Sequence, residues 1–475
     1  MTTSTSPTPA PGGEPPTTTG ETAFEDLPPR RTIRQAVAAS AMGNATEWYD
    51  YGAYAVVATY IAAHFFPSGS EGLFWTYAFL AISFIARPFG GFVWGPLGDR
   101  MGRKQVLALT IILMSAATFL IGVLPTASTP GFSFLAPAIL VLLRFCQGIG
   151  LGGEWSGAAL LATENAPPGK RALYGTFPQL GAPVGFILSN LLFVLLSVQL
   201  TSEQFTAWGW RVPFLLSSVL VIVGLWVRLK LMESPAFQKV LDEQRVASVP
   251  IARVFRTAWR PLVLATLAMV ATYVLFYLMT AFLMVVGTTA ADEASARAAA
   301  EAAGKGFDPS SFAPGLGYER TDFLTMLIIG VVFFGVFTVV SGPLADRLGR
   351  KRLLLVVTVL IGVFGLVLDP LMHAGTAGVM AALILGFTLM GLTFGPMAAF
   401  LPEMFRADVR YTGSAVSYNM ASVIGAAPAP YAMIWLWQQQ GGSLLLVGSY
   451  LAVAAVVTLG ALVIGGETKD VDYLA

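Results

Sequence analysis

Twelve apolar stretches, each long enough to cross a membrane as a helix, dominate the 475-residue sequence and constrain its fold most strongly. A spanning helix needs about 20 mostly apolar residues. The stretches are residues 38–64, 73–97, 105–125, 134–163, 172–198, 209–230, 259–288, 320–344, 353–371, 376–402, 411–437 and 443–465. Charged residues make up 12% of the chain, whereas a soluble protein carries about 25%. We therefore predict an all-α integral membrane protein with twelve transmembrane helices.

Lysine and arginine are distributed unevenly between the two sides that these helices define. Of the 28 basic residues, 22 fall on the side of the termini, 4 on the opposite side and 2 within helices. Basic residues favour the cytoplasmic side, so we expect a cell-membrane protein with both termini in the cytoplasm. Residues 1–30 are rich in Thr, Pro and Ser, lack the pattern of a signal peptide and are predicted to be a disordered tail.

A repeated motif divides the chain into two six-helix halves. GPLGDRMGRKQVL at 95–107 recurs as GPLADRLGRKRLL at 342–354, each time after the second helix of its half. The predicted organisation is an N-terminal half at 31–230, a cytoplasmic linker at 231–258 and a C-terminal half at 259–475. Two such parallel repeats indicate a transporter of the major facilitator type, with its site near the middle of the membrane between the halves.

Several other features favour no separate function. The Ala-rich outer loop 289–319 is expected to be a solvated excursion with a short surface helix. The single Cys146 provides neither a disulfide nor a metal site, and we expect no metal or cofactor. His64 and His373 lie near helix ends, where an interfacial role and a proton switch are both open. No basic cluster resembles a nucleic-acid footprint.

Five ionisable residues lie inside apolar stretches of the N-terminal half. They are Glu47, Asp50, Arg87, Arg144 and Glu154. Charges in a bilayer are costly, so they indicate a function and need partners. At about 1.5 Å per residue, Asp50 and Arg144 fall near the middle, and Arg87 and Glu154 fall deeper, near Glu47. We predict the pairs Asp50–Arg144 and Glu47–Arg87, with Glu154 nearby.

These five residues comprise three acids and two arginines, so one buried carboxylate lacks a matching cation. Such a carboxylate can gain and lose a proton near neutral pH. We therefore predict that Glu47 and Asp50, which share a helix face, couple transport to protons. The alternative is that the charges form static ion pairs between helices.

Three stretches give the sequence a resemblance to a known family. GNATEWYDYGAY at 43–54, the two GPLxDRxGRK loops, and RFCQGIGLGGEWSGAALLATENAPPGKR at 144–171 resemble the metabolite:H⁺ symporter branch of the major facilitator superfamily. That branch includes proline/betaine, shikimate, α-ketoglutarate and citrate transporters. The resemblance covers the chain after residue 30.

The resemblance implies roles for particular residues. Asp50 matches the proton site of proton-coupled relatives, and Arg144 matches its switchable partner. The loop residues and the glutamates that end helices 4 and 10 match a cytoplasmic gate of reversible ion pairs. The implied gate residues are Asp99, Arg100, Arg103 and Glu164 in one half and Asp346, Arg347, Arg350 and Glu403 in the other. Gly181, Pro183 and Gly185 should bend helix 5, and their weak similarity to a drug-antiporter motif leaves antiport as an alternative.

Polar and aromatic residues at matching depth are the candidate substrate contacts. They are Arg87, Arg144, Gln147, Glu154, Gln179, Tyr273, Tyr277, Tyr418 and Asn419. Two arginines suit a carboxylate, whereas aromatic rings with carboxylates also suit a betaine-like cation. The amino-acid sequence of helix 4 and the short segment after helix 12 favour a small organic acid, shikimate- or dicarboxylate-like, as the solute. A proton-coupled osmolyte or amino-acid symporter and a uniporter remain alternatives.

The sequence does not favour other classes of protein. It contains no nucleophile–base constellation, so we expect no enzyme activity. It also contains no signalling domain that a transporter-like receptor would need. The expected partners are a small solute, protons and the lipid bilayer, with no nucleic acid and no obligate protein partner.

Overall fold

The computed structural model describes residues 30–65, 71–229, 250–302, 307, 309 and 312–471. The predicted N-terminal tail, apart from Arg30, and the linker up to residue 249 lie outside the described residues.

The N-terminal half supplies six long helical segments. They are α2 (Arg30–Phe65), α3 (Glu71–Met101), α4 (Arg103–Val123), α5 (Leu135–Glu164), the pair α6 (Arg171–Gln179) and α7 (Gly181–Gln199), and α9 (Val212–Leu229). The short α8 (Ser202–Ala207) and η1 (Gly209–Arg211) connect α7 to α9.

The C-terminal half supplies six more, preceded by α11 (Pro250–Thr257). They are the run α12 (Trp259–Ala268), α13 (Val270–Tyr277), η2 (Leu278–Phe282) and α14 (Leu283–Thr288); α16 (Arg320–Leu348); α17 (Arg350–Met372); α18 (Gly375–Glu403); the run α19 (Arg410–Ala421), η4 (Ser422–Ala426) and α20 (Ala429–Gln439); and α21 (Leu445–Ile464).

The predicted twelve-helix membrane fold is confirmed. Within the described residues, nine helical segments have the length and hydropathy of membrane spans. The other three predicted spans are α2, α3 and α9, which are 36, 31 and 18 residues long. Large apolar side chains remain exposed around the bundle, among them Ile222, Trp226 and Val456. In a membrane protein such side chains face lipid.

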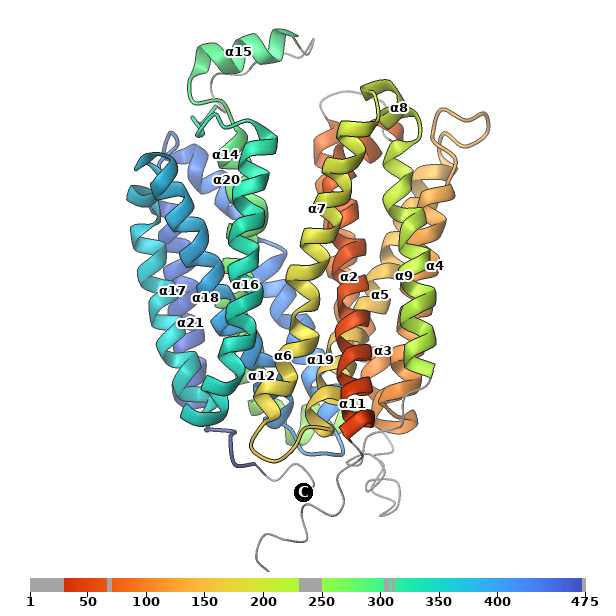
Figure 1. Ribbon diagram of the computed structural model, residues 1–475, viewed down its shortest axis with the longest axis vertical. Helices are drawn as coiled ribbons and strands as arrows, with labels where there is room; N and C mark the ends of the chain where they lie inside the picture. Colours follow the sequence, from red (N-terminus) through yellow and green to blue (C-terminus); the bar gives the residue numbers. More distant parts are fainter. Residues whose placement is uncertain are drawn as a thin grey trace, which may run out of the picture.

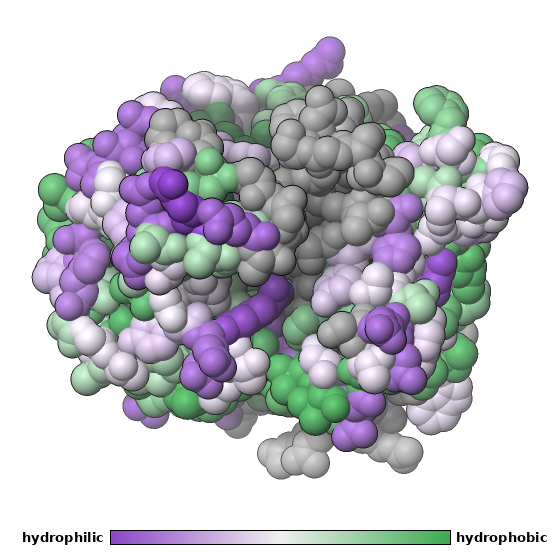
Figure 2. Space-filling view, turned by 90° about the horizontal axis from the view of Figure 1, so that it is seen from above, coloured by the Kyte–Doolittle hydropathy of each residue, from purple (hydrophilic) through white to green (hydrophobic). Residues whose placement is uncertain are grey.

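The two halves stand side by side in Figure 1, and each forms its own bundle. The ribbons of α7 and α16 separate toward the end that carries α15 (Glu293–Ala302), the surface helix expected in loop 289–319. Figure 2 views that end, where many residues are hydrophilic and the perimeter is more hydrophobic. The opposite end holds both GPLxDRxGRK loops, and we call it the basic end.

The fifth span breaks where its sequence predicts a bend. α6 ends at Gln179 and α7 begins at Gly181, because Pro183 cannot donate a backbone hydrogen bond to the preceding turn. A Cβ on Gly181 would lie 2.6 Å from the backbone nitrogen of Ala45, and one on Gly185 would lie 2.6 Å from that of Tyr49. The glycines therefore let this span approach α2 closely.

Candidate functional site

The five predicted charges of the N-terminal half are all buried and come from α2, α3 and α5. Arg144 lies with its guanidinium carbon 3.6 Å from the centre of the Tyr54 ring, in a cation–π contact. Its Nη2 donates to the Ser83 hydroxyl at 3.3 Å. The residue is therefore held between α2, α3 and α5.

Arg144 and Asp50 are joined through two intermediate side chains. Arg144 Nη1 donates to Gln147 Oε1 at 2.9 Å. Gln147 Nε2 donates to Thr118 Oγ1 at 2.6 Å, and Thr118 Oγ1 donates to Asp50 Oδ2 at 2.9 Å. We call these four residues the Arg144–Asp50 chain. Arg144 is also close enough to interact electrostatically with Asp50, so this predicted pair is brought together through Gln147 and Thr118.

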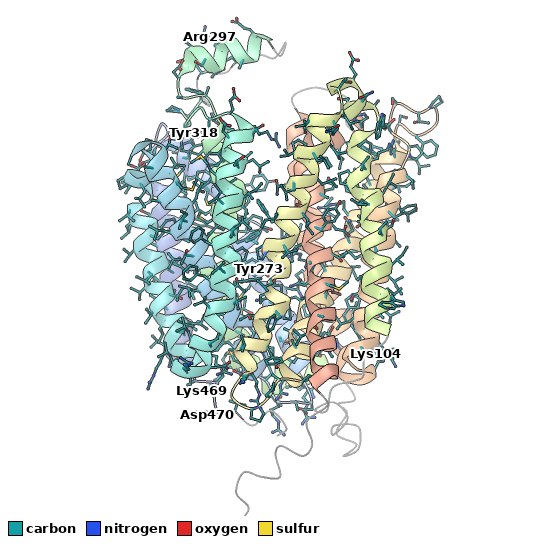
Figure 3. The ribbon with its side chains drawn as sticks, in the orientation of Figure 1. Lys104, Tyr273, Arg297, Tyr318, Lys469 and Asp470 are labelled. Carbon is teal, nitrogen blue, oxygen red and sulfur yellow. The ribbon has the colours of Figure 1, made fainter. Side chains whose placement is uncertain are left out.

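The second predicted pair lies toward the boundary between the halves. Glu47 on α2 and Arg87 on α3 both interact electrostatically with the Tyr418 hydroxyl on α19. Arg87 also interacts with Tyr273 on α13. Figure 3 places Tyr273 near mid-height between the halves. An acid and a guanidinium of one half therefore lie within electrostatic range of tyrosines of the other half.

Aromatic rings form the contact between the halves at this level. Trp155 on α5 stacks on Tyr418, with ring centroids 3.9 Å apart and planes 3° from parallel. The Tyr273 ring lies 5.5 Å from the same Tyr418 ring. Tyr277 lies 5.6 Å from Phe84. We call Glu47, Arg87, Trp155, Tyr273 and Tyr418 the interface cluster.

The two predicted amides outside the Arg144–Asp50 chain bridge the halves by binding backbone. Gln179 accepts from Trp155 Nε1 at 2.8 Å and donates to the Phe394 carbonyl on α18 at 2.7 Å. Asn419 donates to the Gly152 carbonyl on α5 at 2.7 Å. Glu154, in contrast, accepts from Thr110 on α4 at 2.8 Å, so its carboxylate lies inside the N-terminal half.

At the basic end, each loop aspartate binds the first turn of a helix in the other half. Asp99 accepts from the backbone N–H groups of Tyr411 and Thr412 at 3.2 and 2.9 Å, at the start of α19. Asp346 accepts from those of Ala172 and Leu173, both at 3.0 Å, at the start of α6. A carboxylate at a helix N-terminus is stabilised by the free N–H groups and the helix dipole. These matched contacts hold the basic ends of the two halves together.

The C-terminal half adds an ionic network around Arg350. This guanidinium lies 3.2 Å from both Asp346 and Glu403, and it is buried. The segment after α21 extends the network, because Thr468 donates to Glu403 at 2.7 Å. Arg171 of α6 donates to the Val471 carbonyl at 2.9 Å, which links this segment to the N-terminal half.

The remaining predicted gate residues lie at the periphery. Arg100 and Arg347 are exposed and Glu164 is half-buried at the end of α5. The Arg347 carbonyl accepts from Lys469 Nζ at 3.0 Å. The Arg103 side chain lies outside what the structure describes.

Sequence reasoning missed three residues of these sites. Thr118 places a hydroxyl group in the apolar stretch of α4, and a polar side chain at that position could have indicated a site residue. Trp155 follows Glu154 directly, but an aromatic residue in a spanning helix more often packs against lipid or core. Thr468 gave no signal, because its role depends on where the segment after α21 folds back.

Comparison with known proteins agrees with this architecture. Residues 40–430 match the model of the Major Facilitator Superfamily, so the chain belongs to that superfamily. It is 46% identical to the inner membrane metabolite transport protein YhjE of Escherichia coli K12, over 94% of this chain and 97% of that one. The proline/betaine transporter of the same organism is 32% identical, over 90% and 82% of the two chains. The predicted resemblance to metabolite transporters of this superfamily is confirmed.

A solved structure shares the fold. The proton:xylose symporter XylE bound to 6-bromo-6-deoxy-D-glucose superposes with a TM-score of 0.69 at 18% identity, over 94% of this chain and 98% of that one. Together, the superfamily match, the relatives and the spans identify the chain as a multi-pass membrane transporter of small solutes.

Proposed function

We propose that this transporter is a proton-coupled symporter that carries a small organic acid into the cell by alternating access. The observation that carries the proposal is the Arg144–Asp50 chain, which connects a buried carboxylate to a buried guanidinium by hydrogen bonds. Such a carboxylate can take up a proton on one side of the membrane and release it on the other.

Arg87 is the proposed anchor for the carboxylate of the solute. It belongs to the interface cluster, where both halves contribute side chains. A guanidinium binds a carboxylate with two parallel hydrogen bonds, which fixes the orientation of the solute. Gln179, Asn419, Tyr273, Tyr277 and Tyr418 line the same boundary and are proposed to set its position. Glu154, which accepts a hydrogen bond from Thr110, is proposed to hold α5 against α4 within the N-terminal half.

The basic end is the proposed cytoplasmic gate, with both termini in the cytoplasm. Asp99 and Asp346 hold it closed through helix N-termini of the opposite half, and transport requires that these contacts open and re-form. The basic residues concentrated there support this orientation.

The divisions at residues 31–230, 231–258 and 259–475 stay predictions. The transport role also predicts no enzyme activity and no obligate protein partner.

A zwitterionic osmolyte or amino acid is the second candidate solute. The observation that favours it is Glu47 beside stacked Trp155 and Tyr418, since a carboxylate and aromatic faces attract a quaternary amine. The relative named a proline/betaine transporter also points to this class. A uniporter in which the charges form static pairs is the third candidate.

De-energised cells that express the protein in weak buffer would test these alternatives. Pooled organic acids and then pooled proline and glycine betaine are added while external pH is recorded. Alkalinisation with one pool, absent in Asp50→Asn, would establish proton symport and choose the solute class. Solute counterflow without alkalinisation by either pool would contradict proton coupling and favour the uniporter.

A further inference from the structure

Thr118 connects the two charged ends of the Arg144–Asp50 chain from a helix that carries neither of them. It lies on α4 and is buried, as are Asp50, Gln147 and Arg144. Its hydroxyl oxygen lies 2.9 Å from Asp50 Oδ2, 2.6 Å from Gln147 Nε2 and 3.0 Å from the Met114 carbonyl oxygen. A hydroxyl has one proton and two acceptor positions, so Thr118 cannot donate to an ionised Asp50 and to the Met114 carbonyl at the same time.

The direction of the hydrogen bonds follows from the chemistry of Arg144. A guanidinium has donors only, so the Gln147 atom 2.9 Å from Arg144 must be the amide oxygen. The Gln147 nitrogen therefore faces Thr118 and donates to it. Thr118 is left with one proton, which can point to Asp50 or to the Met114 carbonyl. Arg144 is therefore fixed as the donor to Gln147, and Gln147 as the donor to Thr118. The Thr118 hydroxyl, in contrast, can reverse the direction of its hydrogen bond.

We propose that Thr118 is a positioning residue of the proton-coupling site, whose hydroxyl reverses direction when Asp50 takes up a proton. This inference rests on the proposed role of Asp50. When Asp50 is ionised, Thr118 donates to Oδ2. When Asp50 is protonated, its O–H donates to Thr118, and the Thr118 proton turns to the Met114 carbonyl. Gln147 donates to Thr118 in both states, so the link to Arg144 is kept throughout.

Among the contacts that the structure describes, the other groups around Asp50 do not provide this connection. The charged or titratable groups that interact with its carboxylate are Arg144 from α5 and Tyr49 from α2 itself. Ser217 on α9 also hydrogen-bonds to the Asp50 carboxylate, and its hydroxyl lies 2.9 Å from the Phe214 carbonyl oxygen. Among the described contacts, Thr118 is the member that joins the carboxylate to Gln147 and Arg144. In a buried site, hydrogen bonds aligned in one direction strengthen one another.

Thr118→Val tests the inference, because valine keeps the branched shape and removes both donor and acceptor. The ionised form of Asp50 then loses a stabilising hydrogen bond, so the Asp50 carboxyl group should keep its proton up to a higher pH. We expect the pH of half-maximal uptake to rise by about one unit, equal to a tenfold change in proton affinity. Thr118→Ser retains the hydroxyl and should restore the original profile.

Two readouts separate this inference from the proposed function. Uptake of the solute pool that alkalinises the medium gives one pH profile. Infrared titration of the carboxylic C=O band that disappears in Asp50→Asn gives a second that needs no solute. If Thr118→Val leaves both midpoints unchanged, or if Thr118→Ser shifts them equally, the role of Thr118 is wrong and that of Asp50 stands.

A different result would contradict the proposed function itself. If Asp50→Asn keeps proton-driven uptake and removes no C=O band, Asp50 does not carry the proton. Should Thr118→Val fail to accumulate in the membrane, Thr118→Ala replaces it, and the same shift is expected relative to Thr118→Ser. An unchanged midpoint in Thr118→Ala would overturn the inference.

Discussion

In the N-terminal half, buried charges lie along α2, α3 and α5 within the spans as well as at Asp99 of the basic end, whereas in the C-terminal half they lie near the basic end. There, the buried charged residues among those described are Arg350, Glu403, Asp408 and Arg410. At mid-height the C-terminal half instead supplies aromatic rings, of which Tyr273 and Tyr418 interact electrostatically with Arg87. At mid-height, therefore, the N-terminal half holds the buried charges and the C-terminal half presents an aromatic face.

The largest effect should come from removing the carboxylate of Asp50, which has no counterpart in the first helix of the C-terminal half. Asp50→Asn keeps a hydrogen-bonding side chain but cannot exchange a proton. Proton-driven accumulation should fall by about 100-fold or more, about 2.7 kcal/mol at 1.36 kcal/mol per tenfold, while counterflow persists. Uptake with and without an uncoupler measures this. Full accumulation of solute in the variant would contradict the proposal that the N-terminal half alone carries the exchangeable proton.

The next effect tests the charges at the basic end of the C-terminal half. Arg350→Gln would leave Asp346 and Glu403 buried without their shared cation. Loss of one partner from a buried ion pair costs about 3–5 kcal/mol, so thermal unfolding in detergent should begin at clearly lower temperature. Arg347→Gln, an exposed arginine of the same loop, is the matched control and should change little. Equal losses in both variants would mean that burial of the network is not what matters.

A smaller effect is expected where the loop aspartates bind the helix N-termini of the other half. Asp99→Asn and Asp346→Asn each remove the charge from a helix N-terminus, a contribution of about 0.3–1 kcal/mol and up to about 2. Each should shift the population toward conformers open at the basic end by about 2- to 30-fold. Distances between spin labels on the two halves would measure the shift. Asp346→Asn also removes an ion pair with Arg350, so a larger shift in Asp99→Asn would show that the Asp99 contact dominates the gate.

The smallest effect concerns the aromatic face. Tyr418→Phe keeps the ring that stacks on Trp155 and removes only the hydroxyl. If the ring surface forms the site, the KM for the transported pool should change by less than about threefold, and Tyr418→Ala should change it much more. A large loss in Tyr418→Phe would instead indicate that the hydroxyl binds the solute or couples to Arg87.

The sequence predicted the twelve spans, the two halves and the five buried charges, because each is a local pattern of polarity within about 20 residues. Depth estimates along ideal helices also placed Asp50 and Arg144 at a similar level. They could not show that Gln147 and Thr118 stand between the two, since helix rotation and packing decide which side chains meet. The stacking of Trp155 on Tyr418 was equally hidden, because it joins residues of opposite halves.

The contact between Arg171 and Val471 has a consequence for genetics. Arg171 binds the carbonyl oxygen of residue 471, and every amino acid carries that oxygen. Replacing the Val471 side chain should therefore leave the bond in place, so a mutational scan of this position would report it as tolerant. Shortening or lengthening the segment between α21 and residue 471 would move the carbonyl and break the tie. A deletion or insertion series would thus detect a connection that substitutions cannot reveal.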